Sequence, residues 1–151
     1  MARILVADDD PDMQLVLQVA LESEGHTVAL ASNGTAALEI CLHGEIDLAL
    51  LDVTMPGLKG HEVVSRVRAD AQRQGLPILL VSANSLLEDV DLGLAAGADD
   101  YLTKPFNTFE LKRRVERMVW LTQDLEKPDD RGRIRRTAQE TLARLMPSKR
   151  D

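Results

Sequence analysis

Residues 3–11, RILVADDDP, pass directly from a short apolar run into three acidic residues and a proline. The run RILVA is typical of a strand buried in a sheet, and Pro11 is tolerated in the first turn of a helix. The residues that follow place four apolar side chains on one stripe with helical spacing, which we expect to face the core: Met13, Val16, Leu17 and Ala20. This stretch therefore predicts a strand, an acidic turn and a helix.

The same alternation of strand and helix patterns continues along the chain. Four further candidate strands are each followed by a stretch with helical spacing: TVALA (27–31), DLALLD (47–52), PILLVSA (77–83) and the weaker ADDYLT (98–103). Such repetition is typical of βαβ units. We therefore predict an α/β fold, with a parallel sheet and helices on both of its faces, over residues 1–123.

Composition limits the class of protein. The chain has 151 residues, of which 44% are hydrophobic and 28% charged, as in an ordinary globular domain. Its one cysteine, Cys41, excludes an intrachain disulfide or a cysteine zinc cluster. No apolar run approaches the roughly 20 residues of a membrane span. The N-terminus is acidic and lacks a signal-peptide core, so we expect a cytoplasmic protein without membrane contact.

Charge is unevenly distributed between the predicted domain and the tail. Residues 1–123 carry 10 Lys and Arg against 19 Asp and Glu, whereas residues 124–151 carry 8 against 6. The acidic domain would repel nucleic-acid phosphates, and we read the tail arginines as a solvated helix face. We therefore expect no direct nucleic-acid binding.

The tail, residues 124–151, is predicted to be a linker and a short amphipathic helix. The stretch EKPDDRGR (126–133) has the composition of a linker. After it, four apolar residues recur on one helical face over about three turns: Ile134, Ala138, Leu142 and Leu145. Either this helix self-associates or docks a partner, or it begins a signalling helix that leads into an output domain.

Polar side chains with reactive groups follow four of the predicted strands. Asp8 and Asp9 follow the first strand, Asp52 ends the third, Ser82 lies at the end of the fourth and Lys104 follows the fifth. The carboxyl ends of parallel strands meet at one edge of the sheet, where ligands of open α/β sheets bind. We therefore expect these side chains to gather in one site.

The residue types at this edge favour phosphoryl chemistry. Like charges about 4 Å apart repel by several kcal/mol, on the order of 4 at an effective dielectric near 20. A hard divalent cation would relieve this, and oxygen ligands suit Mg²⁺. A carboxylate beside a cation, Lys104 and the Ser82 hydroxyl can attack phosphorus and form an aspartyl phosphate. Lys104 would stabilise charge on the phosphoryl oxygens.

At these residues the sequence resembles the receiver domain of two-component response regulators. Four pieces carry the resemblance, in order and at βα spacing: ILVADDDP (4–11), LALLDVTMPGLKG (48–60), PILLVSA (77–83) and GADDYLTKPF (97–106). It covers about residues 2–122. It implies a flavodoxin-like, doubly wound five-stranded sheet of order 2-1-3-4-5.

The resemblance also implies a role for each matching residue. Asp52 would be the phosphoacceptor, and Lys104 would pair with the phosphoryl group. The Mg²⁺ ligands would be Asp8, Asp9, Asp52 and the backbone carbonyl of Thr54. Ser82 and Tyr101 would be the switch residues, and the Lys104–Pro105 peptide bond would be cis.

The resemblance also implies which partners the protein has. The phosphodonor would be a sensor histidine kinase or a phosphotransfer protein, and phosphorylation would change binding to an unknown downstream protein or self-association as a homodimer. The chain would not be an enzyme beyond its own phosphorylation and dephosphorylation. Many transcription-factor members use a basic residue of the fourth helix in their dimer, and SLLEDVDLGLAAG (85–97) has none.

Other functions remain open at this point. A haloacid-dehalogenase-type phosphatase also forms an aspartyl phosphate, but it needs an acid where this chain has Thr54. A flavodoxin-like binding module would need a Ser-, Thr- and Gly-rich phosphate loop in place of DDDP. A receiver fold could act as a constitutive scaffold. Alternatively, the chain is the receiver part of a longer response regulator with an output domain.

Overall fold

The computed structural model describes residues 1–122 and 129–146. Within these ranges the chain forms five strands: β1 (Arg3–Ala7), β2 (Thr27–Ala31), β3 (Leu48–Asp52), β4 (Ile78–Ala83) and β5 (Asp100–Lys104). The same ranges contain six α-helices: α1 (Pro11–Glu22), α2 (Gly34–His43), α3 (Gly60–Ala69), α4 (Leu87–Ala96), α5 (Thr108–Thr122) and α6 (Asp129–Leu145). A short 3₁₀ helix, η1 (Asn84–Leu86), precedes α4.

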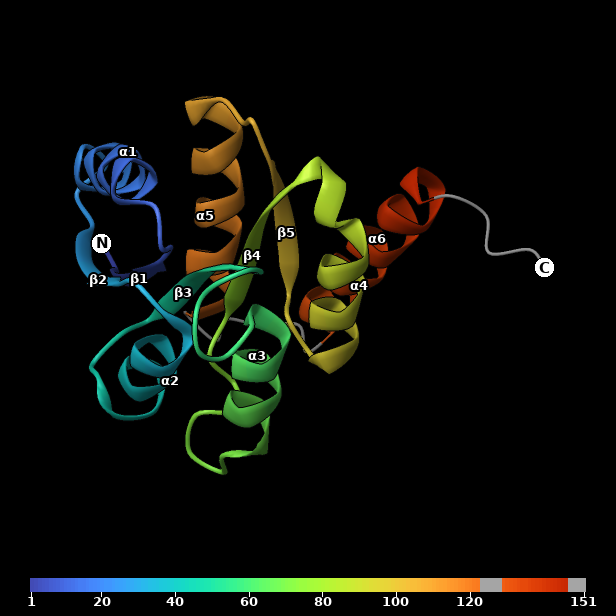
Figure 1. The fold of residues 1–151 in the computed structure, drawn as a ribbon, viewed down its shortest axis with the longest axis horizontal. Helices are drawn as coiled ribbons and strands as arrows, with labels where there is room; N and C mark the ends of the chain where they lie inside the picture. Colours follow the sequence, from blue (N-terminus) through green and yellow to red (C-terminus); the bar gives the residue numbers. More distant parts are fainter. Residues whose placement is uncertain (123–128, 147–151) are drawn as a thin grey trace.

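The strands form one parallel sheet in the order β2-β1-β3-β4-β5, which confirms the predicted fold class. Helices α1 and α5 cover one face, and α2, α3 and α4 cover the other (Figure 1). Side chains alternate between the two faces along each strand. In β1, Ile4 and Val6 belong to the α1–α5 core, whereas Leu5 and Ala7 belong to the opposite core.

Helix α1 shows where the predicted stripe was right and where it was wrong. Leu17 and Ala20 are buried against the sheet, and Met13 is partly buried. Val16 was expected in the core but is 49% exposed, while Leu21 is buried. The buried face of α1 is therefore rotated toward Leu21, because the helix packs against both β1 and β2. The Asp10 carboxylate caps the helix by accepting a hydrogen bond from the Asp12 N–H, 2.9 Å.

The tail differs from the prediction in two respects. Residues 129–133, assigned to the linker, are helical, so α6 begins five residues earlier than expected and runs for 17 residues. The predicted linker residues 126–128 lie outside the described residues. Ile134, Ala138 and Leu142 pack against the rest of the chain, whereas Leu145 is 57% exposed. The apolar stripe thus packs on its own domain, an arrangement that the sequence pattern did not predict.

Among the described residues, no helix has the length and apolar character needed to cross a bilayer.

The loop between β3 and α3 is held against the start of α2 by Gly34. The Gly34 N–H donates to the Pro56 carbonyl, 2.9 Å. A Cβ at Gly34 would lie 1.8 Å from the Leu58 carbonyl oxygen, which is backbone and cannot move away as a side chain would. Glycine is therefore required where α2 meets the loop that follows Asp52.

We expect Gly34→Ala to lower the free energy of unfolding by about 1–3 kcal/mol, because the added methyl forces the loop away from α2. Urea unfolding measures this. Gly132→Ala is the matched control, since its Cβ would meet only the Arg136 guanidinium at an ordinary 3.6 Å. Alanine there should leave stability unchanged or raise it by up to about 1 kcal/mol through helix propensity. Equal effects of the two substitutions would contradict the packing argument.

Candidate functional site

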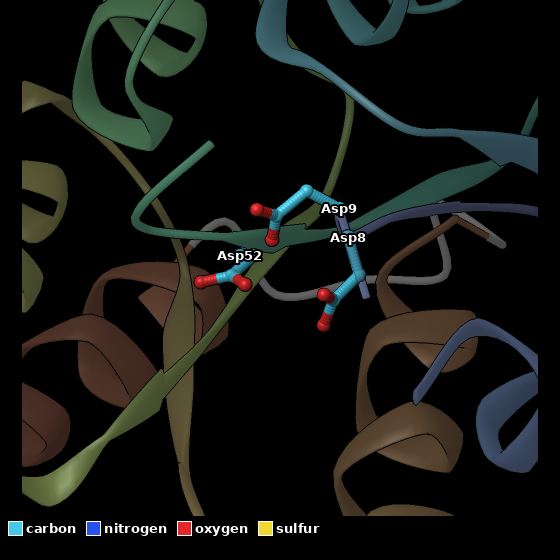
Figure 2. Close-up of side chains that lie close together, drawn as sticks. All are labelled: Asp8, Asp9 and Asp52. Carbon is cyan, nitrogen blue, oxygen red and sulfur yellow. The ribbon is translucent and has the colours of Figure 1, made fainter. Parts of the chain in front are cut away.

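Three carboxylates lie together at the carboxyl edge of the sheet. Strands β1 and β3 are neighbours, with Ala7 paired to Leu51, so the residues that follow them are adjacent. Oxygens of Asp8, Asp9 and Asp52 all lie within 4.8 Å of one another (Figure 2). Asp8 and Asp52 are buried, at 1% and 8% exposure, whereas Asp9 is exposed. The structure therefore brings together the acids that the sequence predicted for this site.

Lys104 completes the cluster from the end of β5. Its Nζ lies 3.0 Å from Asp8 Oδ2 and 3.4 Å from Asp52 Oδ2. The ammonium group thus bridges the two buried carboxylates and offsets part of their repulsion. The Lys104–Pro105 peptide bond that follows is cis.

Backbone groups and one further side chain orient the acids. The Asp10 N–H donates to Asp8 Oδ1, 2.9 Å, and the Thr54 N–H donates to Asp52 Oδ1, 3.1 Å. Gln14 Nε2 on α1 donates to the Asp8 carbonyl, 2.6 Å, and to the Ala31 carbonyl, 3.1 Å. Gln14 is a positioning residue that the sequence analysis missed. Its only signal was a polar residue one turn after the Asp10 cap.

The protonation of Lys104 and Asp52 is set by burial and by their mutual charge. Burial raises the pKa of the Asp52 carboxyl, against the Thr54 N–H bond and the Lys104 charge, which lower it. Burial lowers the pKa of Lys104, but its hydrogen bond to Asp8 and the charges of Asp52 and Asp8 raise it overall. Lys104 therefore stays cationic at neutral pH.

The expected switch residues lie on the two strands beyond Asp52. Ser82, on β4, is fully buried, and its hydroxyl donates to the Ala83 carbonyl, 3.0 Å. Tyr101 pairs with Leu80 across β4 and β5, and it is buried in the core cluster that also contains side chains of α4. Ser82 directly follows Val81, the residue that pairs with Asp52 across β3 and β4, while Tyr101 lies on the same strand as Lys104.

The residues present fit a hard divalent cation. The site offers carboxylate oxygens from three side chains that converge on one point, and Asp9 is open to solvent. Such an all-oxygen donor set, with room for water, suits Mg²⁺. Asp8, Asp9 and Asp52 would hold the ion, and the Thr54 carbonyl is the further ligand that the family resemblance implies.

Comparison with known proteins then decides the family. Residues 4–116 match the family model of the response regulator receiver domain. The chain belongs to the response regulator receiver family. Its strand order and its acidic edge are those that the sequence resemblance implied.

Curated relatives of this receiver domain are longer regulators. The transcriptional regulatory protein TcrA of Mycobacterium tuberculosis is 45% identical over 113 residues, which are 75% of this chain and 44% of TcrA. The DNA-binding response regulator MtrA of Mycolicibacterium smegmatis is 41% identical over 122 residues, 81% of this chain and 52% of MtrA. The chain therefore spans about half the length of the curated relatives it matches.

Solved structures of similar fold are receiver domains. The receiver domain of the sensor histidine kinase PA1611 from Pseudomonas aeruginosa, with magnesium in its active-site cleft, superposes with a TM-score of 0.73 and is 34% identical. That match covers 79% of this chain and 98% of the other. The response regulator TrrA of Thermotoga maritima, in complex with Mg²⁺ and BeF, has a TM-score of 0.70 and is 39% identical, over 78% of this chain and 99% of TrrA.

We expect Asp9→Asn to weaken Mg²⁺ binding by about 10-fold or more, because it removes one charged ligand from the cluster. Isothermal titration with MgCl₂ measures the affinity. Asp10→Asn is the matched control, since it removes one negative charge from the neighbouring residue and keeps a side chain that caps helices equally well. Its Mg²⁺ affinity should change by less than about 3-fold. Equal weakening in both variants would show that bulk charge alone attracts the ion.

Proposed function

We propose that this receiver domain is a phosphorylation-controlled signalling switch that accepts a phosphoryl group on Asp52. The observation that supports this is the position of Lys104 Nζ, within 3.4 Å of both Asp8 and Asp52 at the edge of a carboxylate cluster. This arrangement places the proposed nucleophile, Asp52, next to the Lys104 ammonium group and to the carboxylate oxygens that could bind a metal ion. The donor would be a phosphohistidine of a sensor histidine kinase or of a phosphotransfer protein.

The proposed transfer is a single displacement at phosphorus. An Asp52 carboxylate oxygen forms the new P–O bond while the P–N bond to the donor histidine breaks, and the released imidazole nitrogen keeps the electron pair and takes up a proton. Lys104 would then turn from the Asp52 carboxylate to the phosphoryl oxygens. Magnesium, when bound, would supply further charge neutralisation there.

Phosphorylation would act on binding through Ser82 and Tyr101. The Ser82 hydroxyl, now bonded to the Ala83 carbonyl, would donate to a phosphoryl oxygen instead, and Tyr101 would repack. The face of α4, β5 and α5 would change as a result and favour a downstream protein or a homodimer. In this proposal the chain is not an enzyme for an external substrate, since it catalyses at most its own phosphorylation and dephosphorylation. It works in the cytoplasm, where the ATP that supplies kinases is found.

A second candidate is that the chain is the receiver part of a longer response regulator. The coverage of the curated relatives favours it, since TcrA and MtrA are matched over 44% and 52% of their lengths. MtrA is a DNA-binding response regulator. A DNA-binding output domain in the longer protein would therefore contradict our expectation of no nucleic-acid binding. Within residues 1–123 the charge balance of 10 basic to 19 acidic residues still opposes direct binding. DNA binding by the chain itself, measured at low and at physiological salt, would overturn that expectation.

We expect the protein to gain one phosphoryl group on incubation with acetyl phosphate and Mg²⁺, as measured by intact mass. The gain should be lost in Asp52→Asn and on chelation of Mg²⁺ with EDTA, because the nucleophile or the charge neutralisation is then removed.

Asp12→Asn is a suitable control for this experiment, since Asp12 lies in the first turn of α1 outside the cluster. It should be phosphorylated as the parent protein is. A phosphoryl gain that persists in Asp52→Asn would contradict Asp52 as the acceptor. Multiple turnovers of a phosphate monoester would favour a phosphatase instead.

A further inference from the structure

Helix α6 packs across α4 and β5 of its own domain (Figure 1). Ala138 and Leu142 are buried, at 5% and 0% exposure, and join the same apolar cluster as Val90 and Leu94 of α4. Leu145, one turn beyond, is 57% exposed. Most of α6 thus lies at the surface, and a few side chains hold it in place.

Arg135 ties α6 to the turn between α4 and β5. Its guanidinium donates to the carbonyls of Gly97, 2.9 Å, and Ala98, 3.0 Å, and lies 3.3 Å from Asp99 Oδ1. Arg68 of α3 donates to the same Gly97 carbonyl, 2.9 Å, and to Asp99 Oδ2, 3.1 Å. Gly97 ends α4, so a displacement of this end of α4 would change the Arg135 contacts with the Gly97 and Ala98 carbonyls.

Helix α6 also packs against β5, the strand that carries the expected switch residue. Tyr101 is 6% exposed and belongs to the cluster that contains Ala138 and Leu142. On the same strand, Lys104 contacts Asp8 and Asp52. Strand β5 therefore joins the acidic site at one end to the surface beneath α6, and β4, which carries Ser82, leads through η1 into α4.

We propose that α6 is an intramolecular cover of the α4–β5 surface, docked in the unphosphorylated protein and released when Asp52 is phosphorylated. This rests on the proposed function, since it needs phosphorylation to occur. Release requires only that the docked contacts of Arg135, Ala138 and Leu142 differ between the two states of α4 and Tyr101. Because α6 and a partner protein cannot occupy the α4–β5 surface at the same time, release of α6 would also make this surface available to the partner.

The coupling must be reciprocal. If phosphorylation weakens α6 docking by some factor, then a phosphoryl mimic at Asp52 must bind the undocked protein more tightly than the docked protein by the same factor. Substitutions that undock α6 must therefore strengthen binding of the mimic, up to that factor. This consequence can be measured at a site far along the chain from α6. The affinity for the mimic therefore distinguishes an α6 whose docking is coupled to phosphorylation from an α6 whose packing does not depend on it.

The first experiment follows amide hydrogen exchange in the full chain, with and without Mg²⁺ and BeF₃⁻. Amides in residues 135–145 should exchange at least about 5-fold faster with the mimic bound. Amides in the C-terminal half of α2, residues 39–43, lie away from the contact between Gly34 and the loop after Asp52, so they serve as the internal reference and should not change. Unchanged exchange over 135–145 with the mimic bound would overturn the proposal.

The second experiment measures BeF₃⁻ affinity in Mg²⁺ for two variants of α6. Leu142→Ala removes the buried apolar contact, and Arg135→Gln removes the charged contact with the α4–β5 turn. Each should bind BeF₃⁻ about 10-fold more tightly. Leu145→Ala makes a leucine-to-alanine change at an exposed position of the same helix and should stay within about 2-fold. Arg135→Gln carries the test if Leu142→Ala unfolds the domain.

The outcomes distinguish this proposal from the proposed function. Failure of the parent protein to bind BeF₃⁻ and to gain a phosphoryl group would remove the proposed function and, with it, the role of α6. Normal binding with equal affinities in the parent, Leu142→Ala and Arg135→Gln proteins would leave the phosphorylation switch intact and refute only the α6 cover.

Discussion

The chemistry of this molecule depends on one electrostatic constraint, which is that three carboxylates converge on one point at the edge of the sheet. Asp8, Asp9 and Asp52 lie within 4.8 Å of one another, and Lys104 is placed against the two that are buried. One ammonium group cannot neutralise three carboxylates, so the cluster favours a further cation. The parallel sheet maintains this arrangement because the acids lie at the carboxyl ends of β1 and β3, which are neighbouring strands with buried side chains.

A second pair of acids shows how the same sheet stabilises charge without using it for chemistry. Asp99 and Asp100 are adjacent and buried, yet they pair with arginines of different helices. Asp99 meets Arg68 and Arg135, whereas Asp100 meets Arg114 and Arg117 of α5. A buried carboxylate needs such partners, since burial without them is strongly unfavourable. Through Asp99 this network reaches α6, which links the tail to the core.

Much of the fold was predictable from pattern alone. The runs RILVA and TVALA coincide with β1 and β2, and the remaining strands differ from the predicted runs by one or two residues at their ends. The prediction failed at Val16, which a helical stripe assigned to the core and which is 49% exposed. Periodicity identifies an apolar face, but the exact rotation of a helix depends on the neighbours against which it packs.

The sequence by itself determined the α/β class and the meeting of Asp8, Asp9, Asp52 and Lys104, because parallel strands bring their carboxyl ends to one edge. Only the tertiary structure decided that Gln14 supports Asp8, and that α6 packs against β5 with Arg135 on the end of α4. These contacts join segments that are far apart in the chain. Their geometry follows from the shape of packed surfaces, which no local pattern of residues encodes.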